Sequence, residues 1–475
     1  MTLPSQSDLH WWTACELAAA IRHRRLSSVE VVGCFLDRIE QLDGRLNAFL
    51  HLIPRSEALA AANAADEAVA RGDPLGPLHG LPTGVKDLMD VAGMPTTSWT
   101  TVQGAIAATD CLLAERIRTA GAIMVGKTNT PEHGLGTLTF NELGGPTRNP
   151  WNRSYHAGGS SGGAAAAVAA GMLPFADGSD SGGSLRYPAS FCNIVGLRPS
   201  PGRVPTGRVA NGWSPHAVLG PMARNARDAG LLLSAIAGAD WRAPLSLDGD
   251  PAVYAAISPD DLRGVRIAWS DSVGGLPVDP EVARVLRGTR SLLVELGCAV
   301  EDVDLHLEEA DRAWEIIEFQ DFAAACSDDV ERFGTRLRED LIENVRLGRA
   351  LTVEQIAWAE TSRTKLFRST AKLLQCFDII ATPTAPVIAP STDCAWVREI
   401  DGVPMERYHH WQRLACRITM TAHPALSMPA GFTANGMPVG LQLIGRYRDE
   451  LSLLRYAAAF DDAAGLTLRR PADID

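Results

Sequence analysis

Two glycine–serine clusters, separated by an alanine-rich run, constrain this chain more than any other feature. The first cluster is Gly-Gly-Ser-Ser-Gly-Gly at 158–163, and the second is Gly-Ser-Asp-Ser-Gly-Gly-Ser at 178–184. Residues 164–171 between them are small and apolar, which predicts a helix that other backbone segments can approach closely. The clusters could bring serine hydroxyls and free backbone N–H groups to one point. Acyl-transfer chemistry needs such groups, as the nucleophile and as oxyanion donors.

Predicted strands and helices alternate along the chain, so the predicted fold class is α/β with a sheet covered on both faces. Two helices are predicted to begin with capping boxes, Thr13-x-x-Glu16 and Ser27-x-x-Glu30, the second ending near Asp43-Gly44. Further helices are predicted at 56–71, 111–120, 164–171, 282–296 and through most of 308–375. Strands are predicted at 122–125, 191–197, 265–270, 300–305, 378–381, 429–431 and 440–445.

Composition narrows the function classes. The formal net charge of −12 argues against non-specific binding to nucleic acid or to anionic membranes. The nine cysteines include no C-x-x-C pair, so neither a zinc ribbon nor a redox dithiol is predicted. Because their number is odd and they are scattered, we expect them to be reduced thiols in a cytoplasmic protein. Residues 1–10 are polar and contain no signal-peptide core, and no apolar run approaches the ~20 residues of a membrane span. We expect no metal.

One segment matches a nucleotide-binding motif by letters alone. Gly121-x-x-x-x-Gly126-Lys127-Thr128 has the P-loop pattern, but the four intervening residues are Ala-Ile-Met-Val and are typical of a buried strand. Pro131 would also interrupt any helix that began at the lysine. The context therefore argues against nucleotide binding.

The serine clusters admit three interpretations from the residues alone. A flexible linker is disfavoured, because core-like sequence follows the first cluster directly. Gly158-x-Ser160-x-Gly162 matches the nucleophile elbow of α/β-hydrolases, which would make an esterase with Ser160 as nucleophile and a downstream histidine: His216, His409, His410 or His423. The third interpretation uses both clusters with a lysine base. Lys86 stands at the end of a predicted strand beside apolar residues, and desolvation would lower its proton affinity.

The chain resembles the amidase signature family over about residues 13–235 and 372–462. The segments that carry the resemblance include 80–87, 120–132, 145–151, 158–186, 382–384, 423–429 and 436–442, in this order and spacing. The resemblance implies one domain over 1–475, with a signature core at about 75–235, a variable helical segment at about 240–370 and C-terminal signature segments at about 372–462. It also implies a single large mixed sheet between helical layers, an α/β/α sandwich.

The resemblance also implies roles for individual residues. Ser184 would be the nucleophile, Ser160 the bridging serine after a cis peptide bond from Gly159, and Lys86 the base, with no cofactor. The backbone N–H groups of Ser184 and of three residues before it would hold the oxyanion: Ser181, Gly182 and Gly183. Ser161, Ser179, Asp180 and Arg186 would support the site, the last two as an ion pair. Serine stands at 179 and 181 where the family commonly has threonine.

The function implied is hydrolysis of linear non-peptide C–N bonds in small carboxylic amides, with aryl amides, carbamates (a urethanase activity) and esters as further candidates. The alternative is the glutaminase component of a tRNA-dependent amidotransferase, which shares the signature. A non-catalytic binding module is disfavoured because all three catalytic positions are intact. Candidate apolar walls for the substrate are Trp213, Trp314 and Phe319. The candidate assembly is a homodimer.

Overall fold

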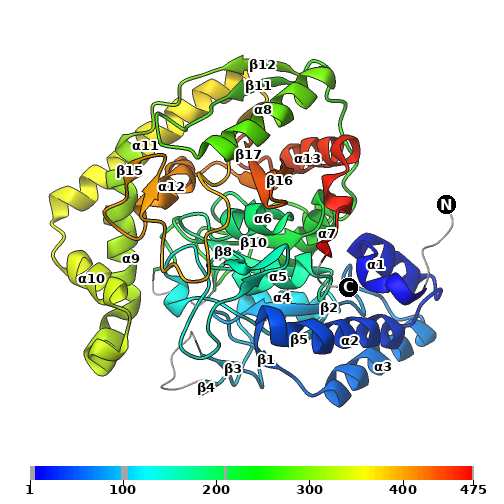
Figure 1. Cartoon of the computed structure of the whole chain (residues 1–475). Coiled ribbons are helices and arrows are strands. Elements are labelled where there is room, and N and C mark those ends of the chain that lie inside the picture. Colours follow the sequence, from blue (N-terminus) through cyan, green and yellow to red (C-terminus); the bar gives the residue numbers. More distant parts are fainter. Residues whose placement is uncertain (1–5, 98–104, 208–210, 473–475) are drawn as a thin grey trace.

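The computed structural model describes residues 6–97, 105–207 and 211–472 (Figure 1). Their centre is a mixed sheet of eleven strands, in the order β1-β5-β2-β8-β10-β9-β16-β17-β13-β11-β12. In that order the bounds are Phe49–Leu52, Ile123–Thr128, Pro82–Lys86, Phe175–Asp180, Val218–Ala223, Val195–Arg198, Ala425–Phe432, Pro438–Ile444, Ile379–Pro383, Arg266–Trp269 and Ala299–Asp302. β2 is parallel to β5 and β8, β11 is parallel to β12 and β13, and the other pairs are antiparallel. The expected single large mixed sheet is confirmed.

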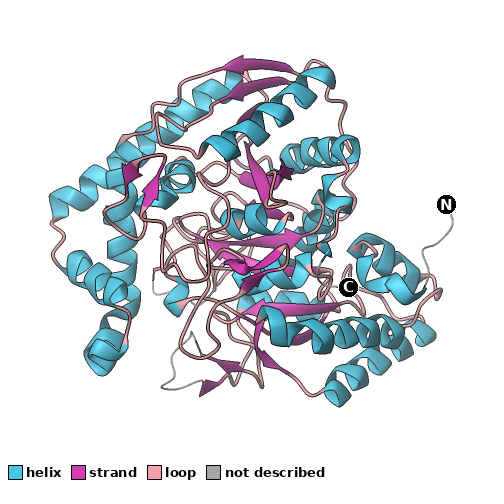
Figure 2. Ribbon diagram, viewed as in Figure 1, coloured by secondary structure: helices cyan, strands magenta, loops and turns pink. Residues whose placement is uncertain are grey.

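Helices cover both faces of this sheet (Figure 2). Alternate side chains of β5 show the two layers: Met124 belongs to an apolar cluster with α1, α4 and α7, whereas Ile123 and Val125 belong to one with α2 and α5. The helices are α1 Ala14–Arg22, α2 Ser28–Leu46, α3 Arg55–Arg71, α4 Leu112–Thr119, α5 Gly162–Ala169, α6 Arg186–Cys192, α7 Ala226–Ile236, α8 Pro280–Glu295, α9 Glu309–Phe333, α10 Glu339–Arg349, α11 Val353–Cys376, α12 Arg413–Met420 and α13 Glu450–Ala464.

Several short strands and 3₁₀ helices lie outside the central sheet and its covering helices. Three two-stranded sheets pair β3 (Pro95–Thr96) with β4 (Ala105–Ile106), β6 (Arg148–Asn149) with β7 (Asn152–His156), and β14 (Glu399–Ile400) with β15 (Val403–Pro404). Short 3₁₀ helices are η1 Gln6–Trp11, η2 Glu132–Gly134, η3 Pro251–Tyr254, η4 Gly334–Arg336, η5 His410–Gln412 and η6 Leu466–Leu468. Within the described residues no helix is long and apolar enough to cross a membrane. Residues 1–5, which belong to the segment expected to lack a signal peptide, lie outside the described residues.

Most predicted helices and strands are present, but several boundaries are corrected. β12 ends at Asp302 instead of residue 305, and β16 begins at Ala425 instead of residue 429. Both capping boxes are present, at Thr13 and Ser27. The second helix runs to Leu46, beyond the expected end near Asp43, and stops where Asn47 adopts a left-handed conformation. The prediction of a strand at 191–197 is also wrong in its first half. The helix α6 continues to Cys192, and Asn193 adopts a left-handed conformation that turns the chain into β9.

The P-loop-like segment is part of β5 and not a phosphate loop. All six residues of β5 are buried, and the strand includes Lys127 and Thr128. Lys127 Nζ lies 3.2 Å from Asp87 Oδ1, and the chain after β5 continues into a short 3₁₀ turn, η2, instead of the helix that a P-loop requires. The prediction that the residues before Gly126 form a buried strand is confirmed, and the strand extends beyond its expected end at Val125 to Thr128.

Candidate active site

The candidate site lies at the carboxyl ends of two neighbouring parallel strands. Lys86 is the last residue of β2, and Ser179 and Asp180 end β8. Because parallel strands end at the same edge of a sheet, these residues meet there. Ser160 and Ser161 reach the same point from the start of α5.

Lys86 is fully buried and faces three serine hydroxyls. Its Nζ lies 2.7 Å from Ser160 Oγ, 2.9 Å from Ser161 Oγ and 2.9 Å from Ser179 Oγ. Burial lowers the pKa of Lys86 to about 7, although the negative charges of Asp177 and Asp180 oppose this shift. A lysine with this pKa is substantially neutral near pH 7 and can accept a proton.

The Gly159–Ser160 peptide bond is cis, as the family resemblance led us to expect. Gly159 has no room for a side chain, since a Cβ there would lie 2.8 Å from the carbonyl carbon of Leu138. Ser161 N–H donates to the carbonyl of Ser184 at 3.3 Å, which links the two serine clusters through their backbones. The first cluster is therefore a tightly packed turn and not a flexible linker.

The loop from Ser181 to Ser184 is organised by the carboxylate of Asp180. Its two oxygens accept the backbone N–H groups of Gly183 at 3.0 Å and of Leu185 at 3.1 Å. The N–H of Gly183, which we expected to face the oxyanion, is thus already hydrogen-bonded to Asp180. The N–H groups of Ser181, Gly182 and Ser184 remain as the candidate oxyanion donors.

A buried charge cluster fixes this loop to the rest of the sheet. Arg186 donates to both oxygens of Asp180, from Nη2 at 2.8 Å and from Nε at 3.0 Å, which confirms the expected ion pair. Arg198 adds a second guanidinium 3.3 Å from Asp180, and Arg186 also donates to Gln442 of β17 at 2.7 Å. Burial raises the pKa of Asp180, but the two guanidinium groups outweigh it and hold the pKa well below its usual range. Asp180 is therefore a permanent anion.

Ser160 and Ser184 both line a cavity of about 360 Å³. Most of the lining residues are apolar, among them Leu88, Met89, Leu112, Leu113, Val218, Leu219 and Phe322. The lining also includes four titratable groups besides Asp90, Asp180 and two cysteines: His133, His216, Glu318 and Asp321. Several of these residues come from one helix, α9, at positions 318, 321, 322 and 325. This i, i+3, i+4, i+7 spacing was the signal in the sequence that could have identified a cavity-lining face.

The three aromatic residues expected to form substrate walls lie elsewhere. Trp213 is 71% exposed and borders a separate surface depression with Phe367. Trp314 is buried behind the serine loop, where its Nε1 donates to the carbonyl of Ser181 at 3.1 Å. Phe319 is buried and packs against His409. Trp314 precedes Glu318 by one turn on the same side of α9, whereas Phe319 lies off the 318–325 stripe. Neither is among the cavity-lining residues.

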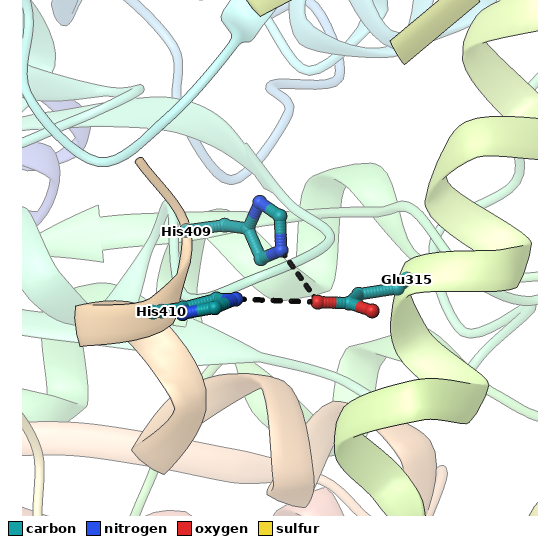
Figure 3. A group of neighbouring side chains, drawn as sticks. All are labelled: Glu315, His409 and His410. Atoms are coloured by element: carbon teal, nitrogen blue, oxygen red, sulfur yellow. Dashed lines mark hydrogen bonds and ion pairs between the residues drawn. The ribbon is translucent and has the colours of Figure 1, made fainter. Parts of the chain in front are cut away.

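The four candidate elbow histidines bind to other groups. His216 Nε2 lies 2.8 Å from Glu318, and His423 Nδ1 lies 2.8 Å from the carbonyl of Thr421. His409 and His410 both point toward Glu315 (Figure 3). The hydroxyl of Ser160 instead contacts Lys86. Over the described residues, this geometry disfavours the elbow interpretation.

At the strand ends of this α/β sandwich, a buried lysine contacts three serine hydroxyls, an arrangement that differs from the Ser-His-Asp sites of histidine-dependent hydrolases. The sequence profile named Amidase matches residues 30–454 of this chain. The chain therefore belongs to the amidase signature family and is an amide hydrolase of that family.

Three comparisons illustrate the relationship. The chain is 35% identical to an acylamidase of Rhodococcus erythropolis, over 99% of both chains. It is 36% identical to the A subunit of the glutamyl-tRNA(Gln) amidotransferase of Moorella thermoacetica, over 98% of this chain and 99% of that one. Its structure superimposes with a TM-score of 0.89 and 30% identity on a bacterial aryl acylamidase of the amidase signature family, over 97% of this chain and 98% of the other.

Proposed function

We propose that this protein hydrolyses small amides through an acyl-enzyme on Ser184, with Ser160 and Lys86 as the proton relay. The observation that carries the proposal is the fully buried Lys86 Nζ, which lies 2.7 Å from Ser160 Oγ beside the cavity that Ser184 also lines. A neutral amine has two N–H bonds and one lone pair. Two of the three serine contacts then remain donations from Lys86, and in the third Ser160 donates its proton to Lys86.

In the first half-reaction, Lys86 accepts the proton of Ser160 as Ser160 accepts that of Ser184. Ser184 Oγ forms a bond to the carbonyl carbon of the substrate, and the carbonyl oxygen becomes an oxyanion. We assign its stabilisation to the N–H groups of Ser181, Gly182 and Ser184, where one donor can be worth about 3 kcal/mol of barrier. The relayed proton returns to the substrate nitrogen, the C–N bond breaks and the amine leaves.

In the second half-reaction, water attacks the ester on Ser184. The same relay removes a proton from the water and returns it to Ser184 Oγ when the C–O bond breaks. The products are a carboxylic acid and an amine, and the enzyme regains its starting protonation.

The many apolar lining residues of the cavity favour an amide with an aliphatic or aryl group. The similarity to an acylamidase and to an aryl acylamidase supports this substrate class. Carbamates and esters present the same carbonyl carbon and are secondary candidate substrates. We propose that the chain acts on a small molecule without nucleic acid or membrane, as a homodimer in the cytoplasm, where its nine free cysteines would stay reduced.

A glutaminase that works within an amidotransferase is the second candidate, because the similarity to an amidotransferase component is as high as that to the acylamidase. Such a glutaminase would need partner chains for its synthetic reaction. The two functions differ in whether the isolated chain hydrolyses amides other than glutamine.

A substrate panel tests the proposal. Amine or ammonia release would be measured for aryl amides, aliphatic amides, carbamates and glutamine, and alcohol release for esters. Ser184→Ala is the blank, and size-exclusion chromatography measures the assembly. We expect aryl or aliphatic amides to be turned over by the chain alone. Turnover of glutamine and of no other compound would favour the glutaminase instead.

A further inference from the structure

We propose that Glu315, His409 and His410 form a binding site for a divalent transition metal such as Zn²⁺, outside the serine–lysine cluster. Glu315 lies on α9, and the two histidines lie at the entry to η5 (Figure 3). The sequence contains no motif for such a site, because Glu315 and His409 are 94 residues apart and only the fold brings them together.

The carboxylate oxygen stands at a distance from each imidazole nitrogen that suits ligands of one ion. Glu315 Oε1 lies 2.9 Å from His409 Nε2 and 3.5 Å from His410 Nε2, and all three atoms lie within 4.8 Å of one another. Ligands about 2.0–2.2 Å from a single zinc ion stand roughly 3–3.5 Å apart. A carboxylate with two imidazoles also matches the ligand preference of Zn²⁺ and of Co²⁺ or Ni²⁺.

The surroundings allow an ion to enter and an open position to remain. The side chain of His409 is only 3% exposed, whereas those of His410 and Glu315 are 11% and 27% exposed. Aromatic rings of Trp314, Phe319 and Tyr408 surround His409 on the buried side. The site therefore has a rigid apolar wall and one edge open to solvent, where water would complete the coordination.

One feature limits the affinity. His409 Nδ1 is buried and has no hydrogen-bond partner among the described residues. When a metal occupies Nε2, the ring proton resides on Nδ1, and a metal-binding histidine usually donates this proton to an acceptor. Loss of such an acceptor typically weakens metal binding by about 10- to 100-fold. We therefore expect a dissociation constant on the order of micromolar, above that of a closed structural zinc site.

The test must separate this site from thiols, which also bind zinc. Cys376 and Cys394 are exposed, so the parent for all measurements would be the double variant Cys376→Ser/Cys394→Ser. After chelator treatment, the full-length protein would be titrated with Zn²⁺ by calorimetry and with Co²⁺ by visible absorption. We expect one equivalent to bind with micromolar affinity and Tm to rise with metal concentration.

Variants of the metal-binding residues test the site directly. His410→Ala and Glu315→Gln should each weaken Zn²⁺ binding at least tenfold, while circular dichroism verifies that both variants fold. His306→Ala is the matched control, because its side chain is 80% exposed and its nearest carboxylate, Asp304, is 3.9 Å away. This control should bind like the parent. Unchanged affinity in both ligand variants, or no saturation by the parent in the micromolar range, would overturn the proposal.

Discussion

Lys86 carries the proton transfers in the proposed mechanism, and its burial determines the pH at which it can act. Because burial lowers its pKa to about 7, the ammonium form predominates below that pH and cannot accept a proton. We expect kcat/KM for an amide to rise as pH increases through about 7 and to level off above it. The measurement is the pH–rate profile of the free enzyme, and a profile that is flat from pH 6 to 9 would contradict a lysine base.

Replacement of this lysine tests the same role by a second route. Lys86→Met should lower kcat by about 10²- to 10⁴-fold, the usual contribution of a positioned base. The fold should persist, since methionine fills a similar apolar volume, and circular dichroism checks this. Lys365→Met, on the exposed surface of α11, is the control and should keep full activity. Activity of Lys86→Met near that of the parent at neutral pH would rule out the relay.

We expect Arg186 to act on stability and not on the substrate. It is fully buried and pairs with Asp180, so Arg186→Met leaves a buried anion with only Arg198 as its charged partner. Loss of one partner of a buried ion pair typically costs about 3–5 kcal/mol. The surface pair Arg227–Asp462 provides the control, since Arg227→Met should cost only about 0–1 kcal/mol. Urea unfolding compares the two, and equal losses would show that burial of the Asp180 cluster does not matter.

At the scale of elements, α9 supports the serine loop from behind. Trp314 donates to the carbonyl of Ser181, and a Cβ on Gly182 would lie 2.9 Å from the Trp314 ring. Trp314→Phe removes this hydrogen bond, worth about 0.5–1.5 kcal/mol, and loosens the oxyanion donors. We expect kcat to fall by roughly 3- to 10-fold with little change in KM. Trp358→Phe on α11 is the control, and a change in KM alone would contradict the assignment.

Element boundaries were predictable where local chemistry determines them. The capping boxes at Thr13 and Ser27 and the buried strand predicted at 122–125 follow from neighbouring residues. The end of α6 depends on a left-handed Asn193, which the apolar run around it conceals.

The site was predictable only in part from the residues themselves. The serine clusters stood out, but the contact of Lys86 with Ser160 spans 74 residues. The residues alone offered a lysine base as one of three interpretations, and the family resemblance selected it. The residues that line the substrate cavity could not be predicted from the positions of aromatic residues, because the side of α9 that faces the cavity depends on tertiary packing. Phe322 lines the cavity, whereas Phe319, three residues earlier, packs on His409. The roles of these residues remain proposals that the variants above test.

At the scale of the whole molecule, one sheet joins the two ends of the chain. β9 from the first half pairs with β16 from the last, and β17 then pairs with β13. We therefore propose a single domain over 1–475, in which the exposed connection at 248–250 carries little of the stability.

Cleavage at that connection tests the single domain. A protease site inserted after Gly249 should allow cutting into two fragments that co-elute and stay active, because the β9–β16 pairing and the Arg186–Gln442 hydrogen bond persist. Each fragment expressed alone should be insoluble, since the cut exposes a sheet edge. Fragments that separate after cleavage and fold independently would indicate two domains.

The identity of the nucleophile is the central claim, and intact mass spectrometry tests it most directly. The parent, Ser160→Ala and Ser184→Ala would each be treated with a fluorophosphonate, and the mass of the covalent adduct would be measured. This mechanism predicts an adduct on the parent, a slower adduct on Ser160→Ala and none on Ser184→Ala. An adduct that survives Ser184→Ala and is lost in Ser160→Ala would contradict the mechanism and make Ser160 the nucleophile.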